Sequence, residues 1–164
     1  MATGGRRHSS TKLVQDLAFA ALIEGRLRAS TCLPLVLADG RSFSGVNPSF
    51  LVSRYVAGQY FAPHFDGNIL VEDGPLAGCV SEFTTVLYLS DDFVGGGTHY
   101  LPGQGSEVAE PPAVLRPGMG SASVHRQGTV LHCGAEVLEG VKYVMQFSLV
   151  YEPPAEPFEM KPFR

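Results

Sequence analysis

The sequence predicts a mainly β protein, a jelly roll of eight core strands with one N-terminal helix packed on a sheet. Two observations lead to this fold class. Short runs of alternating or β-branched residues follow one another, divided by turn residues, as in an antiparallel sandwich or barrel. One segment alone has the three- and four-residue apolar spacing of an amphipathic helix. The 19 glycines and 12 prolines agree with a chain of many turns.

Length and composition favour a single domain over residues 1–164, because 164 residues with 45% hydrophobic content match the usual domain size. The net charge of −4 argues against a nucleic-acid partner. No apolar run approaches the roughly eighteen residues of a membrane span, and no signal peptide is recognisable. We therefore expect a cytoplasmic protein without membrane contact. The odd number and wide spacing of Cys32, Cys79 and Cys133 favour reduced thiols over disulfides.

The N-terminal part contains the expected helix. Residues 1–10 are polar and small, which indicates a loose terminus. The helix is expected over residues 11–27, with Ser10 or Thr11 as its N-cap. Its apolar positions are Leu13, Val14, Leu17, Ala20 and Ala21. After it, Asp39-Gly40 is a strong hairpin signal between two short runs, 33–38 and 41–44.

The core strands come next, and turn residues separate them. A glycine-rich turn is expected over 91–97, another turn at Pro117-Gly118, and Glu139-Gly140 is expected to close a hairpin. The long loops are 67–81 and 102–112. The eight expected strands are 49–56, 60–66, 82–89, 98–101, 113–116, 120–125, 129–133 and 141–151.

A candidate metal site is formed by His64 and Asp66 on one extended segment and by His132 on a distant strand. Two imidazoles and a carboxylate can occupy one face of an octahedral metal and leave three positions open, which is typical of non-haem iron oxygenases. Taken alone, the His-x-Asp triplet is weak evidence. A surface histidine at a strand end followed by a turn aspartate gives the same pattern.

Several segments carry a family resemblance, and they occur in one order along the chain. They are RYVAGQYFAPHFD at 54–66, FTTVLYLSD at 83–91 with Gly95 to Thr98, LRPGMG at 115–120, and then His132 to Gly140, Lys142 and Tyr151. This ordered set resembles the prolyl 4-hydroxylase-like group of iron(II)- and 2-oxoglutarate-dependent dioxygenases. The resemblance spans roughly residues 47–151, and an ordered set is far more specific than one motif.

The resemblance implies a double-stranded β-helix that holds Fe(II) through His64, Asp66 and His132. It also implies 2-oxoglutarate as co-substrate, O2 as oxidant and ascorbate as a further candidate. Lys142, ten positions after His132, would pair with the second carboxylate of 2-oxoglutarate. Tyr55 and Tyr88 could donate hydrogen bonds to this co-substrate, although both could equally be core aromatics. Thr84 could join the same pocket or serve only in β-branched packing.

The last expected strand tests this assignment by its alternation. Lys142, Gln146 and Ser148 share a polar face, which we expect to line the cavity, while residues on the other face are apolar. The alternative is an edge strand with Lys142 in solvent. His99 and His125 compete with His132 as the distal ligand, but neither has a basic residue at the family's interval.

The sequence also offers candidates for contact with the substrate. Candidates are Arg54, His99 and Arg126. His125 and Arg126 are expected to be solvated turn residues, with a substrate contact as the alternative. The loop 67–81 follows two expected ligands directly, so we expect it to act as a lid, and its Glu72 and Asp73 favour a cationic or neutral partner.

The resulting hypothesis is hydroxylation of a C–H bond coupled to oxidative decarboxylation of 2-oxoglutarate to succinate. By resemblance, the first choice of substrate is a prolyl or other side chain in a peptide or protein, and the second is a free amino acid or small metabolite. The chain is shorter than typical relatives, and Val144 and Met145 replace small or polar residues after the basic residue. A hypothesis of another class is a non-catalytic jelly-roll module that binds a ligand or senses iron or oxygen.

Overall fold

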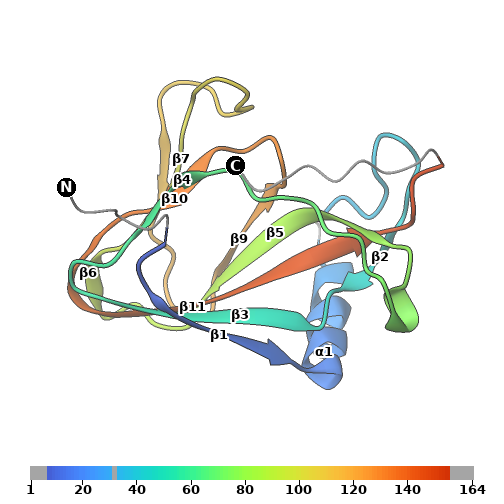
Figure 1. Ribbon diagram of the computed structural model, residues 1–164, viewed down its shortest axis with the longest axis horizontal. Coiled ribbons are helices and arrows are strands. Elements are labelled where there is room, and N and C mark those ends of the chain that lie inside the picture. The colour runs from blue at the N-terminus through green and yellow to red at the C-terminus, as the bar shows by residue number, and fades with distance from the viewer. Residues whose placement is uncertain (1–6, 31–32, 156–164) are drawn as a thin grey trace.

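The computed structural model describes residues 7–30 and 33–155. Expectations for residues 1–6 and for Cys32 lie outside these ranges, whereas Cys79 and Cys133 are free thiols. Most of its regular secondary structure is strand (Figure 1). The elements are β1 (Ser10–Gln15), α1 (Leu17–Arg28), β2 (Phe43–Val46), β3 (Ser49–Val56), β4 (Phe61–His64), the 3-10 turn η1 (Gly74–Leu76), β5 (Val80–Tyr88), β6 (Phe93–Gly95), β7 (Thr98–Tyr100), β8 (Ala113–Leu115), β9 (Ala122–Arg126), β10 (His132–Gly134) and β11 (Val137–Tyr151).

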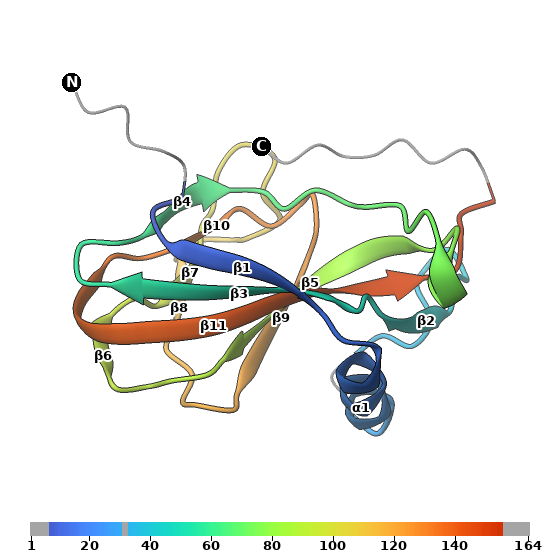
Figure 2. The ribbon, with the colours of Figure 1, turned by 60° about the horizontal axis from the view of Figure 1, so that its bottom comes forward.

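Two antiparallel sheets make up the fold. The larger sheet has the strand order β1-β3-β11-β5-β9, and β2 and β6 also pair with β11. The smaller sheet has the order β4-β10-β7-β8. The two views show the smaller sheet lying over one face of the larger one, with α1 below the opposite face (Figures 1 and 2). All eight expected core strands are present, and the predicted jelly roll is confirmed.

One hydrophobic core joins α1 to the larger sheet. Alternate residues of β11 point toward the helix, among them Met145, Phe147 and Leu149, and they pack with Phe50 of β3 and Ala20 of α1. The predicted packing of the helix on one sheet is therefore confirmed. The amphipathic pattern of the helix is satisfied by this single face, because its other side remains exposed.

The second core lies between the sheets, on the other face of β11. It contains Tyr55, Phe61, Tyr88, Val137 and Val144. The same face of β11 carries Lys142, Gln146 and Ser148, as the alternation of the sequence predicts. The interior between the sheets is thus apolar around Val144 and polar toward Gln146 and Ser148.

The expected start of the helix is wrong. Residues 10–15 form β1, which pairs with β3 from Ser10 opposite Arg54 to Gln15 opposite Ser49. The helix begins only after Asp16, whose side chain accepts a hydrogen bond from the backbone N–H of Phe19 at 2.9 Å. Apolar spacing at Leu13 and Val14 imitates a helix, but pairing along an open strand edge overrides that local pattern.

Two turn assignments also need correction. Glu139-Gly140 does not close a hairpin, because both residues lie inside β11 opposite β6. Gly140 has φ +78°, and a Cβ there would lie 2.4 Å from the carbonyl oxygen of Asp92, so the glycine serves a close backbone approach. The glycine-rich turn expected over 91–97 likewise contains strand β6.

The turn at Asp39-Gly40 is present, with the backbone N–H of Leu37 bonded to the carbonyl of Arg41. The two arms of this short hairpin meet at the antiparallel bridge between Val36 and Ser42 and at the bond from the N–H of Phe43 to the carbonyl of Leu35. Phe43 begins β2, which also pairs with β11. Within the described ranges, no helix has the length and apolar character that crossing a bilayer requires.

Candidate metal centre

His64, Asp66 and His132 come together between the sheets. His64 ends β4 and His132 begins β10, and the two residues are direct partners in the antiparallel ladder. Asp66 follows His64 by two positions, so both side chains leave the extended chain on the same side. One ligand atom from each of the three lies within 4.8 Å of the others. All three side chains are buried, with exposed fractions of 1%, 5% and 5%.

Hydrogen bonds behind the two histidines orient them as ligands. Nδ1 of His64 lies 2.8 Å from the carbonyl oxygen of Ala62, and Nδ1 of His132 lies 3.0 Å from that of Val130. Because a carbonyl can only accept, Nδ1 carries the proton in both rings and the lone pair is on Nε2. Each Nε2 faces Asp66, at 3.4 Å for His64 and 3.6 Å for His132.

The charges of the site fit a divalent cation. Burial, reinforced by the neighbouring His125, lowers the pKa of His132 to about 3, so this ring is neutral at physiological pH. Burial alone would raise the pKa of Asp66, but the hydrogen bond from His125 and the adjacent rings of His64 and His132 hold it well below the usual value. Two imidazoles and one carboxylate therefore converge, which is a donor set for an imidazole- and carboxylate-binding metal such as Fe(II).

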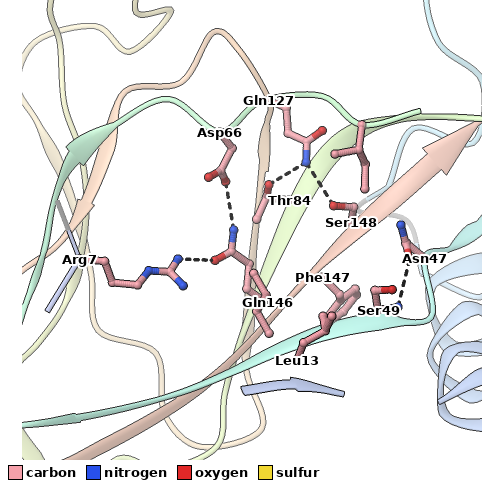
Figure 3. Close-up of a pocket in the computed structure, with 13 residues that line it drawn as sticks. Arg7, Leu13, Asn47, Ser49, Asp66, Thr84, Gln127, Gln146, Phe147 and Ser148 are labelled. Atoms are coloured by element: carbon pink, nitrogen blue, oxygen red, sulfur yellow. Dashed lines mark hydrogen bonds between the residues drawn. The ribbon is translucent and has the colours of Figure 1, made fainter. Parts of the chain in front are cut away.

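The carboxylate of Asp66 is held through Oδ2. Nε2 of His125 lies 3.1 Å from this oxygen, and Gln146 donates to it through Nε2 at 3.4 Å. Arg7 in turn donates to Oε1 of Gln146 at 3.2 Å, and its guanidinium lies 4.0 Å above the ring of Phe61. Figure 3 shows Gln146 between Arg7 and Asp66. A chain of donors thus reaches the candidate ligand from the N-terminal segment.

Lys142 is a buried cation without an anionic partner. Its side chain is 4% exposed, and Nζ donates to the carbonyl oxygen of Gly96. The amine lies 5.5 Å from the ring centre of Tyr55 and 5.2 Å from that of Tyr88. No carboxylate among the described residues forms an ion pair with it. Burial lowers the pKa of Lys142 to about 8, and a bound anion would relieve this.

Of the other residues expected to contact the co-substrate, Tyr55 and Tyr88 lie near Lys142 and Thr84 does not. Tyr55 lies opposite Lys142 on β3, and Tyr88 is fully buried with its hydroxyl bonded to Thr98. Burial raises the pKa of Tyr88, which keeps its hydroxyl protonated as a donor. Thr84 instead accepts from Nε2 of Gln127 at 3.0 Å and lines a cavity beside Asp66. It is not near Lys142 in the ladder, because it pairs with Ser148.

The three residues expected to contact substrate are not brought to the centre. Arg54 is exposed on the outer face of β3, where its Nε donates to the hydroxyl of Tyr143 at 3.2 Å. Arg126 is exposed at the end of β9. His99 alternates with two inward residues, Thr98 and Tyr100, and so belongs to the outer face of β7.

His125 is the main functional candidate that the sequence reasoning misplaced. The expectation of a solvated turn residue is wrong, since the side chain is 6% exposed and touches Asp66. No pattern in the sequence indicates this burial, because the buried residues Ser123, His125 and Gln127 are polar, whereas the apolar Val124 between them is exposed. Arg7, expected in a loose terminus, was missed for lack of any pattern around it.

A cavity of about 360 Å³ opens beside Asp66 on the side of Gln146 (Figure 3). Its walls combine six amide or hydroxyl side chains with four apolar ones. Those lining it are Arg7, Leu13, Asn47, Ser49, Leu51, Asp66, Gly67, Ile69, Thr84, Gln127, Gln146, Phe147 and Ser148.

A larger groove of about 1100 Å³ runs between α1 and residues 69–76. It shares the lining residues Asn47, Ser49 and Ile69 with the cavity, so the two are neighbours. The described residues lining the groove include four carboxylates and no lysine or arginine. These carboxylates belong to Asp16, Glu24, Glu72 and Asp73.

Comparisons with solved structures identify the same fold. A Pseudomonas putida prolyl-4-hydroxylase superposes with a TM-score of 0.60 at 15% identity, covering 93% of this chain and 76% of that chain. A viral collagen prolyl hydroxylase from Paramecium Bursaria Chlorella virus-1, solved as a 2OG complex, gives 0.55 at 19% identity, covering 90% and 80%. A Trichoplax adhaerens prolyl hydroxylase, in complex with a peptide fragment of the hypoxia inducible factor oxygen degradation domain, gives 0.54 at 14% identity, covering 89% and 65%.

No protein-family model and no curated protein sequence matches the chain. The chain spans less than two thirds of the Trichoplax enzyme, 65% of its length. At identities below 20%, the likeness concerns the arrangement of strands and not the individual side chains. The chain therefore has the double-stranded β-helix fold that these prolyl hydroxylases also have.

Proposed function

We propose that the protein is an Fe(II)- and 2-oxoglutarate-dependent dioxygenase that hydroxylates a C–H bond. The observation that carries this proposal is that the candidate metal centre and the buried amine of Lys142 both lie between the two sheets. Two imidazole lone pairs converge on the buried carboxylate of Asp66, and the interior between the sheets also contains the buried amine of Lys142, which has no carboxylate partner among the described residues. A metal site alone is common, but a metal site beside an unpaired buried cation suits a chelating dicarboxylate.

His64, Asp66 and His132 would hold the iron and leave one side of it open. When bound, iron and 2-oxoglutarate supply the oxidising chemistry: O2 contributes one oxygen atom to succinate, with release of CO2, and one to the substrate. Ascorbate would support turnover as an auxiliary reductant. The protein's own contribution is to fix three donors, to bury them, and to exclude water from the space between the sheets.

Lys142 would bind the distal carboxylate of 2-oxoglutarate. The amine lies between two tyrosine rings, and its one hydrogen-bond acceptor in the structure is the carbonyl of Gly96. An ammonium has three donors, so two remain for a carboxylate. Tyr55 and Tyr88 would form the walls of this co-substrate site, while Thr84 belongs to the cavity on the other side of Asp66.

The substrate would be a side chain of a peptide or protein that approaches through the groove. The cavity beside Asp66 has room for one side chain, and the neighbouring groove between α1 and residues 69–76 has room for the flanking residues. The peptide fragment bound in the Trichoplax structure supports a peptide substrate, because that enzyme has the same fold. The acidic lining of the groove favours basic residues next to the hydroxylated one.

A free amino acid or small metabolite is the second candidate. It is favoured by Arg7, whose guanidinium lines the cavity and forms no ion pair among the described residues. A small molecule with one anionic group could pair with Arg7 and place a C–H bond near Asp66. A peptide substrate would instead need the groove, so mutations along the groove separate the two candidates.

The experiment is anaerobic addition of Fe(II) and 2-oxoglutarate, followed by admission of air. We expect a weak visible charge-transfer band before air and succinate formation after it, stimulated by a basic proline-containing peptide. His132→Ala should abolish the band and Lys142→Met should shift its 2-oxoglutarate dependence. Metal binding without any succinate, under all substrates tried, would favour the non-catalytic binding or sensing module.

A further inference from the structure

His125 occupies a position beside the candidate metal centre that the proposed chemistry does not use. It lies on β9 directly opposite Thr84 of β5 and is buried between the sheets. Its ring centre is 4.1 Å from that of His132. Three imidazoles therefore surround one carboxylate, although the proposed iron site needs only two of them.

The group behind Nδ1 distinguishes this histidine from the other two. Nδ1 of His64 and of His132 each face a backbone carbonyl, whereas Nδ1 of His125 faces the hydroxyl of Tyr100 at 3.2 Å. Burial raises the pKa of Tyr100, so its oxygen keeps the proton and can donate it. When Tyr100 donates to Nδ1, the single proton of a neutral His125 must be on Nε2.

The opposite nitrogen then meets Asp66 as a donor. Nε2 of His125 lies 3.1 Å from Oδ2 of Asp66, which is a good length for an N–H to carboxylate hydrogen bond. A nitrogen that carries a proton has no lone pair for a metal. The described group whose ligand atoms lie within 4.8 Å contains His64, Asp66 and His132 and does not include His125.

We propose that Tyr100 and His125 form a positioning pair that orients Asp66 for the metal and leaves His125 outside the ligand set. The order of donation is Tyr100 hydroxyl to His125 Nδ1, then His125 Nε2 to Asp66 Oδ2. With Oδ2 held by His125 and Gln146, Oδ1 is the oxygen left for the metal. The positioning role of this pair rests on the proposed metal site, whereas its hydrogen-bond pattern does not.

The group that faces Nδ1 thus decides the role of each histidine. A carbonyl at Nδ1 leaves the lone pair of Nε2 to bind the metal, whereas a hydroxyl at Nδ1 places the proton on Nε2. Partners that orient a ligating side chain typically contribute about 10- to 100-fold to metal affinity. A fourth ligand would have another consequence, because four protein ligands leave two places on an octahedral ion and a chelating co-substrate would fill both.

The first test measures ring protonation directly by long-range ¹H–¹⁵N NMR on histidine-labelled, metal-free protein at about pH 8, where an ordinary imidazole is neutral. Single variants assign the signals. We expect the Nε2–H tautomer for His125 and the Nδ1–H tautomer for His64 and His132. Finding the Nδ1–H form at His125 would overturn the proposal whether or not the protein binds metal. In Tyr100→Phe, the preference of His125 for the Nε2–H form should weaken.

The second test measures Co(II) affinity and absorption under anaerobic conditions. His125→Leu should weaken binding about 10- to 100-fold, and His125→Gln, which restores an N–H at the place of Nε2, should recover most of it. The absorption bands at saturation should remain those of wild type, since no ligand is lost. His99→Gln on the outer face of β7 is the matched control and should bind as wild type does.

The outcomes separate the alternatives. A changed Co(II) spectrum in both His125 variants would make His125 a ligand. Unchanged Co(II) affinity in His125→Leu would contradict a positioning role for His125. Thermal unfolding of each metal-free variant identifies a general loss of structure. If a His125 variant has lost structure, the tautomer of His125 in wild type and in Tyr100→Phe decides whether the proposal holds. Failure of the wild type to bind Co(II) would count against the proposed function, while the NMR result would still judge the hydrogen-bond pattern.

Discussion

Lys142 on β11 lies directly across the ladder from Tyr55 on β3, with its amine 5.5 Å from the centre of that ring. The aromatic face offers weak compensation for a charge removed from water. The lowering of the pKa from 10.5 to about 8 corresponds to about 3 kcal/mol of penalty on the charged form. A structural role alone does not account for such a residue, because a methionine would fill the space without the penalty.

Replacing Lys142 by methionine should therefore stabilise the fold and weaken co-substrate binding. At about pH 7 we expect the free energy of unfolding to rise by about 1–3 kcal/mol. The gain should fade as the pH rises from about 8 to about 10.5, where the unfolded lysine also becomes neutral. Urea unfolding and 2-oxoglutarate titration measure the two effects. Lys12→Met, at an exposed site on β1, is the control, and equal stability changes in both variants would contradict the account.

The affinity for 2-oxoglutarate should fall as the medium becomes more alkaline. The amine binds a carboxylate only when protonated, and its pKa is lowered to about 8 by burial. Binding should be strongest below this pH and weaken up to about tenfold per unit above it. Lys142→Arg keeps its charge throughout this range. If the dissociation constant of wild type and of this variant had the same pH dependence above 8, the lysine would not be the titrating group.

His132→Ala should lose metal while keeping the fold. The change removes one of two imidazoles from a site whose remaining donors, His64 and Asp66, give at most a weak chelate. Metal content after dialysis and succinate formation are the measurements, and the circular dichroism spectrum should match that of wild type. His99→Ala is the control on the outer face of β7. Wild-type metal content in His132→Ala would remove this residue from the site.

Reversing the charge of the groove should change substrate use and leave the iron chemistry intact. In Glu72→Lys/Asp73→Lys, turnover of a basic peptide should fall, mainly through a higher KM, because both exposed carboxylates line the groove. Uncoupled succinate formation without peptide should be unchanged. Glu107→Lys/Glu110→Lys, in the loop 102–112, changes the net charge by the same amount and is the control. An equal loss of both rates would mean that the segment supports the fold or the iron site instead.

Gly140 should be intolerant of a side chain. Its φ of +78° and the 2.4 Å approach of the Asp92 carbonyl oxygen to a Cβ at this position predict a loss of about 1–3 kcal/mol in Gly140→Ala. Gly25→Ala, in the middle of α1 with nothing within 4 Å, should instead gain about 0.5–1 kcal/mol. Urea unfolding compares the two. Similar stability of both variants would contradict the close approach of β6 and β11.

The sequence predicts the strands well where burial alternates strictly. Residues 49–56 match β3 in both bounds, because Pro48 and Gly58 flank a run rich in aromatic and β-branched residues. The helix start was misassigned since the choice for residues 10–15 depends on the free edge of β3, which no local pattern reveals. The assignment of His64, Asp66 and His132 as ligands stays a prediction, although the structure brings them together.

The polar surroundings of the centre were beyond sequence reasoning. Whether His125 meets solvent or Asp66 depends on how the smaller sheet lies over β9. Arg7 reaches Gln146 over 139 positions of sequence, a relation that only the folded chain contains. Polar residues inside a β-sandwich have no spacing rule that separates a hydrogen-bonded core residue from an exposed one.

The central place of β11 also governs how the chain reaches its native state. This strand pairs with β2, β3, β5 and β6, and its last residue, Tyr151, donates to the carbonyl of Pro34, 117 positions away. Loop-closure entropy must be overcome before such distant pairings stabilise anything, so folding is expected to be slow for the size of the protein. Until β11 inserts, β3 and β5 have open edges that can recruit other chains. Burial of the candidate metal centre between the two sheets and protection from aggregation are therefore expected to follow the same step, the docking of β11.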